Sequence, residues 1–202
     1  MSELLIATKN VGKIKELEEL LADTPVRLRS LNDFPNAFEP EETGATFAEN
    51  AVLKAQSYAS QTGLWALGDD SGLEVEALGG APGVLSARYA GAGATDAQRI
   101  EKLLREIKEA NDANRRARFV CAMAIARATG EIEFVAEGVS DGSIAFVASG
   151  ANGFGYDPVF VPDGFTETFG ALSNSIKQQI SHRARASRKI IEYLRRFYAA
   201  SS

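Results

Sequence analysis

The chain has 202 residues, of which 45% are apolar and 24% are charged, and its formal net charge is −5. This composition is typical of a soluble globular protein with one sizeable core, and the negative charge argues against a broad nucleic-acid interface. The apolar runs are too short to span a bilayer, the N-terminus lacks the features of a secretory signal, and the single cysteine excludes an internal disulfide. A cytoplasmic protein that binds no membrane is therefore expected.

The first half of the chain predicts an alternation of strands and helices. Three apolar runs are typical of strands, at residues 3–7, 26–31 and 64–68, the last ending at the hexapeptide LGDDSG. Two segments carry apolar side chains at helical spacing, at residues 11–22 and from Ala45 or Thr46 to Gly63. A loop rich in proline, asparagine and glutamate separates the second strand from the second helix.

The second half predicts a helix over 95–110, with Thr95 as its N-cap, and then a region rich in strands. The expected strands are residues 117–128 and 131–139, which are joined at Thr129-Gly130, then 143–148 and the short run 159–161. A glycine-rich loop covers 149–155, and a last helix runs from about Ser181 to Ala199. The pattern favours a single α/β domain over residues 1–202, with a mixed β-sheet flanked by helices.

Five polar loops lie at strand ends or helix starts, where backbone N–H groups are available to bind anions. In the first, TKNVGK, Thr8 and Asn10 lead into a helix whose first turn carries Lys13. A hydroxyl, an amide, an ammonium group and a helix N-terminus together suit a phosphate. The spacing is not that of a Walker A motif, and the same residues also fit an asparagine N-cap beside a solvated lysine.

The second loop, EETG at residues 41–44, precedes the second helix. Glu41 and Glu42 are interpreted either as favourable charges at a helix start or, for one of them, as a metal ligand. Asn50 and Lys54 lie four residues apart on one face of the following helix. We expect that face to be solvated, which is the commoner case.

The third loop is DDSG, residues 69–72. Mg²⁺ prefers a few carboxylates together with waters and substrate phosphates, so Asp69 and Asp70 are candidates to hold it. Adjacent residues at a strand end point to opposite sides, which leaves one aspartate facing the site. An ordinary polar turn is the alternative.

The fourth loop is GFGYDP, residues 153–158. Gly153 and Gly155 let the backbone approach a ligand closely, and Phe154 or Tyr156 can stack on a nucleobase. Asp157 is an acceptor suited to a ring N–H group. A tight turn with two core aromatic residues explains the same pattern.

The fifth loop contains SHR at residues 181–183, with Lys177 four residues before it. Lys177, Ser181, His182 and Arg183 form a dense set of donors at a predicted helix start, which suits keto oxygens or phosphates. His182 is the only histidine of the chain, and no G-x-S-x-G elbow accompanies it. A structural histidine is the alternative.

Taken together, these loops resemble the inosine/xanthosine triphosphate pyrophosphatases. The matching segments span residues 7–186 in the order of that family: ATKNVGK, ETGATFAENAVLKA, GDDSGLEVEALGGAPGVLSARYAG, NGFGYDPVF and KQQISHRARA. The resemblance implies Mg²⁺-dependent hydrolysis of non-canonical purine nucleoside triphosphates (ITP, dITP, XTP) to the monophosphate and pyrophosphate. It also implies an elongated α/β fold of two lobes with the active site in the cleft between them, usually as a homodimer.

The resemblance also implies roles for single residues, which concern the triphosphate, the metal and the base. The triphosphate is bound by Thr8, Asn10 and Lys13, with a further substrate contact from Ser71. The metal carboxylates are Glu42 and Asp70, and Asp70 is also the general base. The base is bound by Phe154, Gly155, Tyr156 and Asp157, and its keto edge is read by Lys177, His182 and Arg183. Asp69 is either a second metal carboxylate or a supporting residue.

The chain departs from the family pattern at Ala171, where relatives often carry an acidic residue. This change affects helix capping or loop order near Lys177 rather than a residue with a chemical role. Attack at the α-phosphorus is the simplest route to the products, and attack at the β-phosphorus is the alternative. Two rival functions are a nucleotide sensor without catalysis and a hydrolase for modified pyrimidine triphosphates.

Overall fold

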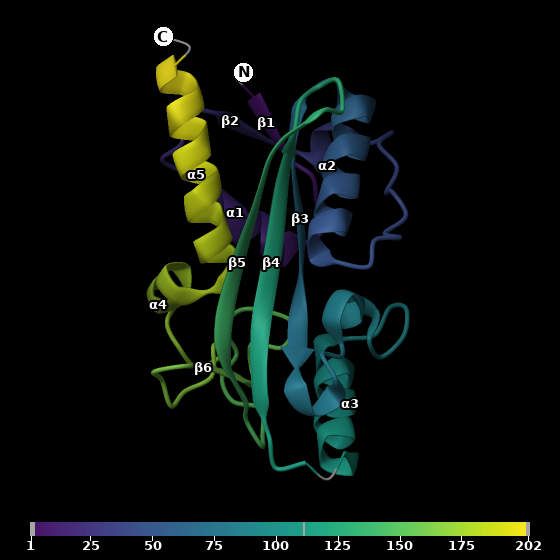
Figure 1. Ribbon diagram of the computed structural model, residues 1–202, viewed down its shortest axis with the longest axis vertical. Coiled ribbons are helices and arrows are strands. Elements are labelled where there is room, and N and C mark those ends of the chain that lie inside the picture. The colour runs from purple at the N-terminus through teal and green to yellow at the C-terminus, as the bar shows by residue number, and fades with distance from the viewer. Residues whose placement is uncertain (1–2, 111, 201–202) are drawn as a thin grey trace. The chain divides into compact units, whose positions relative to one another are not determined.

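The computed structural model describes residues 3–110 and 112–200, which form a mixed β-sheet flanked by helices (Figure 1). The described strands are hydrogen-bonded in the order β2-β1-β3-β4-β5-β6. Their bounds are Glu3–Ile6 (β1), Arg27–Ser30 (β2), Trp65–Val75 (β3), Arg116–Ala126 (β4), Ile132–Ile144 (β5) and Phe160–Pro162 (β6). β1 pairs in parallel with β2 and β3, whereas β5 and β6 are antiparallel. The predicted mixed α/β fold is confirmed.

The helices begin and end close to the positions expected from their capping residues. Their bounds are Val11–Leu20 (α1), Phe47–Thr62 (α2), Asp96–Glu109 (α3), Asn174–Ile180 (α4) and His182–Ala200 (α5). Thr46 and Thr95 each form a complete capping box, and Gly63 ends α2 in the left-handed conformation at φ 69°. Helix α4 was not predicted, because its seven residues are too few to show a helical period.

Two strands are longer than the sequence pattern indicates. β3 does not end at LGDDSG but continues to Val75, and Asp69 and Asp70 are both buried within it. β5 is one continuous strand where two were expected, at 131–139 and 143–148. Gly142 in the expected gap allows β6 to approach, since a Cβ there would lie 2.3 Å from the carbonyl oxygen of Val161. Polar and glycine residues indicate turns in a sequence, but here they remain in extended backbone.

The chain divides into two compact units, each with its own core. Unit 1 comprises Met1–Asp70, Cys121–Gly138 and Arg183–Ser202, and unit 2 comprises Ser71–Val120 and Val139–His182. The organisation of residues 1–202 as one domain stays a prediction. None of the helices within 3–110 and 112–200 combines the length and the apolar character needed to cross a bilayer.

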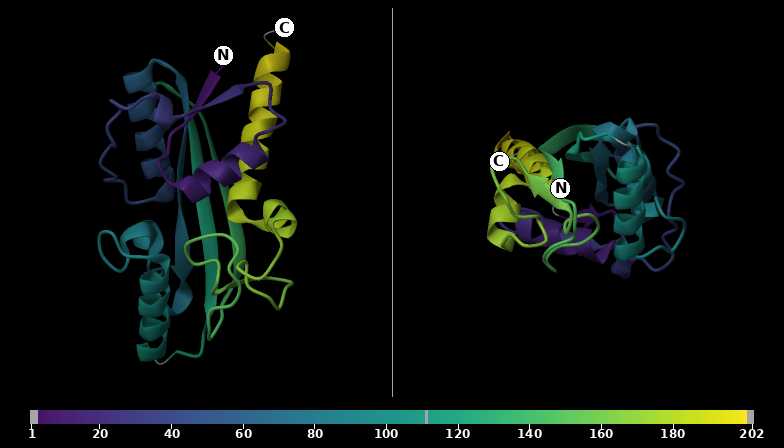
Figure 2. Two further views of the ribbon diagram at one scale, coloured as in Figure 1. Left: turned by 180° about the vertical axis from the view of Figure 1, so that it is seen from behind. Right: turned by 90° about the horizontal axis from the view of Figure 1, so that it is seen from below.

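In unit 1, one face of the sheet packs against α1 and α5 (Figure 2). Its core cluster includes Leu17 of α1, Leu67 of β3, Met123 of β4 and Ile190 of α5. In unit 2, α3 packs through Ile100, Leu103 and Ile107 on a cluster that contains side chains of β3, β4 and β6. These cores fix the strand positions that carry the polar residues described next.

Candidate active site

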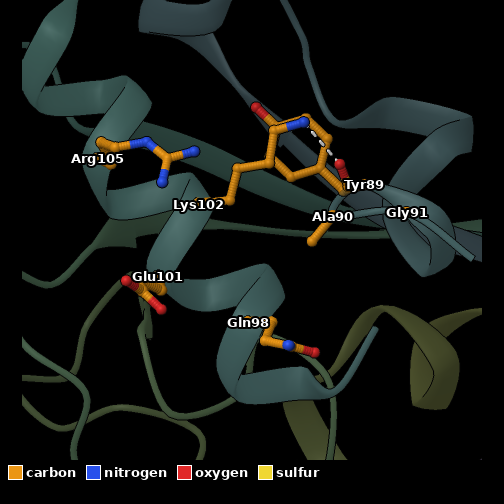
Figure 3. A pocket seen from close by; sticks show the side chains of 7 residues that line it. All are labelled: Tyr89, Ala90, Gly91, Gln98, Glu101, Lys102 and Arg105. Carbon is orange, nitrogen blue, oxygen red and sulfur yellow. Dashed lines mark hydrogen bonds between the residues drawn. The ribbon is translucent and has the colours of Figure 1, made fainter. Parts of the chain in front are cut away.

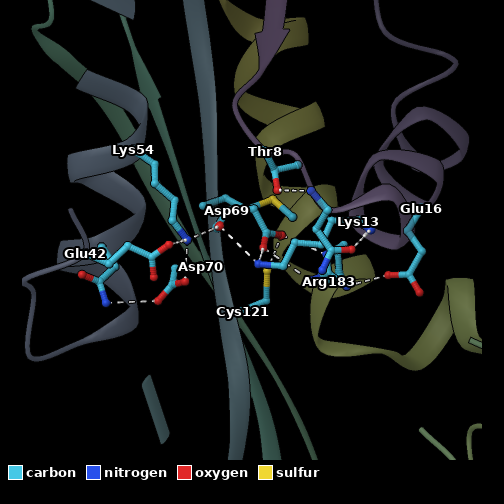
Figure 4. A network of polar contacts seen from close by, with 12 residues as sticks. Thr8, Lys13, Glu16, Glu42, Lys54, Asp69, Asp70, Cys121 and Arg183 are labelled. Carbon is cyan, nitrogen blue, oxygen red and sulfur yellow. Dashed lines mark hydrogen bonds and ion pairs between the residues drawn. The ribbon is translucent and has the colours of Figure 1, made fainter. Parts of the chain in front are cut away.

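Asp69 and Asp70 stand next to each other on β3 and point to opposite faces of the sheet, as strand geometry requires. Asp69 faces Lys13 of α1 and Arg183 of α5, whereas Asp70 faces Lys54 of α2 (Figure 4). The prediction that the two carboxylates serve different sides is confirmed. The alternative of an ordinary polar turn is wrong, because both carboxylates lie inside the strand and pair with cations.

Asp69 lies in a buried ion-pair network within unit 1. Its Oδ1 is 2.5 Å from the Lys13 ammonium, and its Oδ2 is 2.9 Å from the Arg183 Nε. Oδ2 also accepts a hydrogen bond from the Cys121 thiol at 3.3 Å, and Arg183 pairs further with Glu16 at 2.6 Å. Burial alone would raise the pKa of Asp69, but Arg183 and Lys13 outweigh it and hold this pKa well below its usual range. Asp69 is therefore ionised at neutral pH.

Asp70 has a different environment on the opposite face. Its Oδ1 is 2.7 Å from the Lys54 ammonium, which is also 2.8 Å from a carboxylate oxygen of Glu42. The Asn50 amide donates to Oδ2 at 3.3 Å. Burial is the largest influence on the pKa of Asp70 and raises it, although Lys54 and Lys13 act in the opposite direction. Two neighbouring carboxylates whose pKa values are shifted apart are typical of an acid–base site.

The expectation of a solvated face at Asn50 and Lys54 is wrong. Both side chains are buried, and α2 lies so close to β3 that a Cβ at Gly68 would be 2.2 Å from the carbonyl oxygen of Ala51. Asn50 also accepts the N–H of Gly44 at 2.8 Å. This bond fixes the end of the EETG loop, which carries Glu42 toward Lys54.

The TKNVGK loop forms the N-terminus of α1. Asn10 is the N-cap, since its side chain accepts the N–H of Lys13 at 3.1 Å, and the Thr8 hydroxyl accepts the N–H of Asn10 at 3.2 Å. The lysine is not solvated, because its side chain is only 12% exposed and pairs with Asp69. Binding of a phosphate by these three residues stays a prediction.

The GFGYDP loop in unit 2 is organised around Asp157. Its Oδ2 accepts the Lys177 ammonium at 2.5 Å and the N–H of Phe154 at 2.8 Å. The Lys177 nitrogen lies 5.2 Å from the centre of the Phe154 ring. Tyr156 is a buried core residue whose hydroxyl donates to the Ser86 carbonyl, as the alternative interpretation had it. Phe154 is half-buried, as is Gly155, whose N–H donates to Asp96.

The prediction that the donors of the fifth loop lie together at one helix start is wrong. Lys177 lies in the last turn of α4, and Ser181 is the C-cap of that helix. His182 begins α5 and stacks on Phe119, with ring centres 4.6 Å apart. Lys177 pairs with Asp157, whereas Arg183 is buried against other carboxylates. Their roles in reading a base stay predictions, as does the substrate contact of the half-buried Ser71.

Comparison with known proteins gives the evolutionary context of these residues. The model of the Ham1 family matches residues 4–193. The chain belongs to the Ham1 family. It is 50% identical over 192 residues to the dITP/XTP pyrophosphatase of Geobacillus kaustophilus, covering 95% of this chain and 94% of that protein. A match of 45% identity to the dITP/XTP pyrophosphatase of Bacillus anthracis covers 95% and 96% of the two chains.

Solved structures of Ham1 proteins support the same assignment. A HAM1 protein from Coxiella burnetii superposes with a TM-score of 0.90 at 42% identity, covering 97% of this chain and all 100% of that one. A nucleoside-triphosphatase / dITP/XTP pyrophosphatase from Mycobacterium abscessus gives a TM-score of 0.74 at 42% identity, over 95% and 99% of the two chains. The family resemblance inferred from the five segments is confirmed.

The carboxylates of the EETG loop and of β3 in this Ham1 chain form a donor set that fits a divalent cation. Glu42 and Asp70 come from separate segments, yet one ammonium group contacts both carboxylates. Two converging carboxylates, completed by water and phosphate oxygens, are the ligands that Mg²⁺ prefers. A nearby cation would also stabilise the ionised form of Asp70, which burial disfavours.

Four polar residues of the network in this Ham1 chain were not predicted from the sequence: Glu16, Asn50, Lys54 and Cys121. A signal existed only for α2, where Asn50 and Lys54 share a helical face with the buried Ala51 and Ala55. Small apolar neighbours indicate a helix face packed closely on a sheet rather than one in solvent. Glu16 and Cys121 join the network through tertiary contacts that no local pattern indicates.

A separate hollow of about 530 Å³ lies in unit 2, between the segment after η3 (Gly83–Arg88) and helix α3 (Figure 3). Its lining residues are Tyr89, Ala90, Gly91, Gln98, Glu101, Lys102 and Arg105. Lys102 donates to the Tyr89 carbonyl at 2.7 Å, and its ammonium lies over the Tyr89 ring. None of these seven residues belongs to the predicted site.

Proposed function

We propose that this chain hydrolyses non-canonical purine nucleoside triphosphates, including dITP, ITP and XTP, to the monophosphate and pyrophosphate. The observation that carries the proposal is the buried Asp70 beside Lys54 and Glu42, in a chain whose Ham1 relatives are dITP/XTP pyrophosphatases. A carboxylate with a raised pKa is suited to accept a proton from water. Removal of deaminated purines from the nucleotide pool is the corresponding cellular role.

The reaction follows from the groups in unit 1. Asp70 takes a proton from the attacking water or orients that water toward the α-phosphorus, and the bond to the leaving pyrophosphate breaks. Lys13, Lys54 and the N–H groups at the start of α1 bind the phosphate oxygens. Glu42 and Asp70 would hold Mg²⁺, which offsets the charge of the phosphates when it is bound.

Base selection is assigned to the groups of unit 2. Phe154 offers a ring for stacking, and Lys177 can only donate hydrogen bonds. Inosine and xanthosine present a 6-keto acceptor, whereas adenine presents a 6-amino donor that would leave Lys177 facing another donor. Asp157 fixes the position of Lys177 through the 2.5 Å ion pair.

A substrate screen tests this function. The purified protein is incubated with Mg²⁺ and each canonical triphosphate, then with ITP, dITP and XTP, and the release of pyrophosphate and of phosphate is measured separately. We expect pyrophosphate from the three non-canonical purines only. Phosphate release would place the cleavage elsewhere, faster turnover of a modified pyrimidine triphosphate would change the substrate class, and tight binding without turnover would indicate a nucleotide sensor.

We also propose that the protein is cytoplasmic and forms a homodimer, as the family resemblance implies. Light scattering on the purified chain gives its mass directly. A mass of one chain across the micromolar range would contradict the dimer.

A further inference from the structure

Asp69 is an ionised residue at the centre of the network that the proposed reaction does not use. Its carboxylate contacts Lys13 of α1 and Arg183 of α5. Its backbone carbonyl oxygen accepts from Lys13 and from Lys54 of α2, each at 3.3 Å. One residue of β3 therefore contacts cations from three helices (Figure 4).

These contacts place two ammonium groups beside the second aspartate. Lys13 and Lys54 share the same carbonyl oxygen, and Lys54 also pairs with Asp70 at 2.7 Å. Two positive charges stay close together only where anionic groups offset their repulsion. The Asp69 carboxylate supplies one of these negative charges.

The same geometry argues against a role for Asp69 as a second metal carboxylate. Each of its carboxylate oxygens already contacts a protein cation, Oδ1 with Lys13 and Oδ2 with Arg183. A metal ion at Asp69 would have to displace one of these two buried cations, which is costly, whereas Oδ2 of Asp70 accepts a hydrogen bond from the neutral Asn50 amide.

We propose that Asp69 is a positioning residue, which aims the Lys13 and Lys54 ammonium groups at the triphosphate next to Asp70. The inference rests on the proposed function, because it gives the two lysines the phosphates as their target. Asp69 touches neither substrate nor metal in this role. Its carboxylate acts through Lys13, and its backbone carbonyl, which a side-chain substitution keeps, holds Lys54.

A double-mutant cycle on Asp69→Asn and Lys13→Gln tests the proposal with dITP as substrate. Misplacement of a binding group by about 1 Å costs up to ~10²-fold, so Asp69→Asn is expected to lower kcat by roughly 10- to 100-fold. When Lys13 is already glutamine, Asp69→Asn should change kcat by no more than about 2-fold, which is the precision to which independent effects add. Losses that multiply in the double variant would overturn the proposal.

The split between KM and kcat separates positioning from simple charge. If Asp69 only repelled the anionic substrate, Asp69→Asn would lower KM and leave kcat unchanged, and that result would also overturn the proposal. Asp163→Asn is the control, since it also removes a carboxylate charge from an ion pair, the one with Arg116, but lies outside the network. This control is expected to keep kcat within about 2-fold of wild type.

Melting temperatures complete the design. Asp69→Asn leaves Lys13 without this buried partner, whereas the double variant removes both charges of the pair and is expected to regain stability. If the single variant does not fold, an Asp69→Asn/Lys13→Gln protein that matches Lys13→Gln in kcat supports the proposal, and one with a further loss overturns it. A wild-type chain without turnover would overturn the proposed function itself, so the two failures are distinguishable.

Discussion

At the scale of single residues, the adjacent carboxylates of β3 differ because their neighbours differ. Asp69 contacts two cations directly, so its charge is stabilised, whereas the effect of burial prevails at Asp70. Because adjacent side chains of a strand point to opposite faces of the sheet, Asp69 and Asp70 contact different helices. Asp69 can therefore stay ionised while Asp70 can exchange a proton.

The first prediction concerns Asp70→Asn, which keeps the size of the side chain but removes the proton acceptor. Loss of a general base is expected to lower kcat/KM for dITP by at least ~10²-fold. The variant should stay folded, because the raised pKa shows that ionised Asp70 does not favour the native state. A folded variant, checked by circular dichroism, that keeps most of the wild-type rate would exclude Asp70 as the base.

The second prediction is the pH dependence of the wild-type reaction. Asp70 must be ionised to accept a proton, so kcat/KM should fall as the pH drops through its pKa. Burial raises that pKa in the enzyme before metal and substrate bind, so at limiting Mg²⁺ the acid limb should lie above the value of about 3.9 typical of a free aspartate. For stability the sign is opposite: the native state holds this proton more tightly than the unfolded state, so Asp70 disfavours folding as the pH rises through its pKa. A rate profile with an acid limb at or below the ordinary value would contradict the assignment.

The third prediction separates the two lysines by the part of the substrate that each serves. Lys177→Met removes a buried charged donor, worth roughly 1.5–3 kcal/mol or about 10- to 150-fold, and should lower kcat/KM for dITP and XTP. ATP lacks the 6-keto acceptor, so the preference for dITP over ATP should collapse. Lys13→Ala is the control, because a contact to the phosphates should weaken every base alike. An unchanged ratio in Lys177→Met would assign base selection to other residues.

At the scale of elements, the GFGYDP loop shows how two glycines of one segment serve different purposes. Both have positive φ, 74° at Gly153 and 63° at Gly155. A Cβ at Gly153 would lie 1.9 Å from Oδ2 of Asp157, whereas a Cβ at Gly155 would meet no atom within 4 Å. Position 153 therefore requires glycine for two reasons. Its φ is positive, and the Asp157 carboxylate that holds Lys177 approaches its Cα closely.

The fourth prediction compares alanine at these two glycines. The left-handed conformation costs a residue with a Cβ roughly 1–2 kcal/mol, so both variants should lose stability by a similar amount from this cause. Gly153→Ala should lose more, because Asp157 must move, and it should also lower the preference for dITP over ATP. Urea unfolding and the substrate ratio measure the two effects. Equal results for both variants would show that backbone strain alone matters.

At the scale of the whole molecule, the charged groups of chemical interest gather in a chain with a modest net charge of −5. The ion pairs described above for unit 1 join three cations (Lys13, Lys54 and Arg183) to four carboxylates (Glu16, Glu42, Asp69 and Asp70). One negative charge is in excess there. A polyanionic substrate therefore needs a further positive charge, which a divalent metal ion would supply.

The fifth prediction follows from this balance. A chelator should stop hydrolysis of dITP, and Mg²⁺ should restore it, whereas Ca²⁺ should substitute poorly because it is larger and accepts irregular coordination. Glu42→Gln should raise the Mg²⁺ concentration needed for half-maximal rate. Full activity in excess chelator would contradict both the metal and the role assigned to Glu42.

The helices with clear caps, the mixed α/β class and the five segments that indicate the family could all be predicted from the sequence. Thr46, Thr95 and Gly63 mark helix ends through local backbone chemistry, which neighbouring residues are sufficient to determine. Two features are seen only in the folded chain: β3 continues through Asp69 and Asp70, and Lys54 is buried between two carboxylates. Local pattern rules place charged residues in turns or on solvated faces, because burial of a charge is unfavourable without a partner. Here the partners come from segments far apart in the chain, and only folding brings them together.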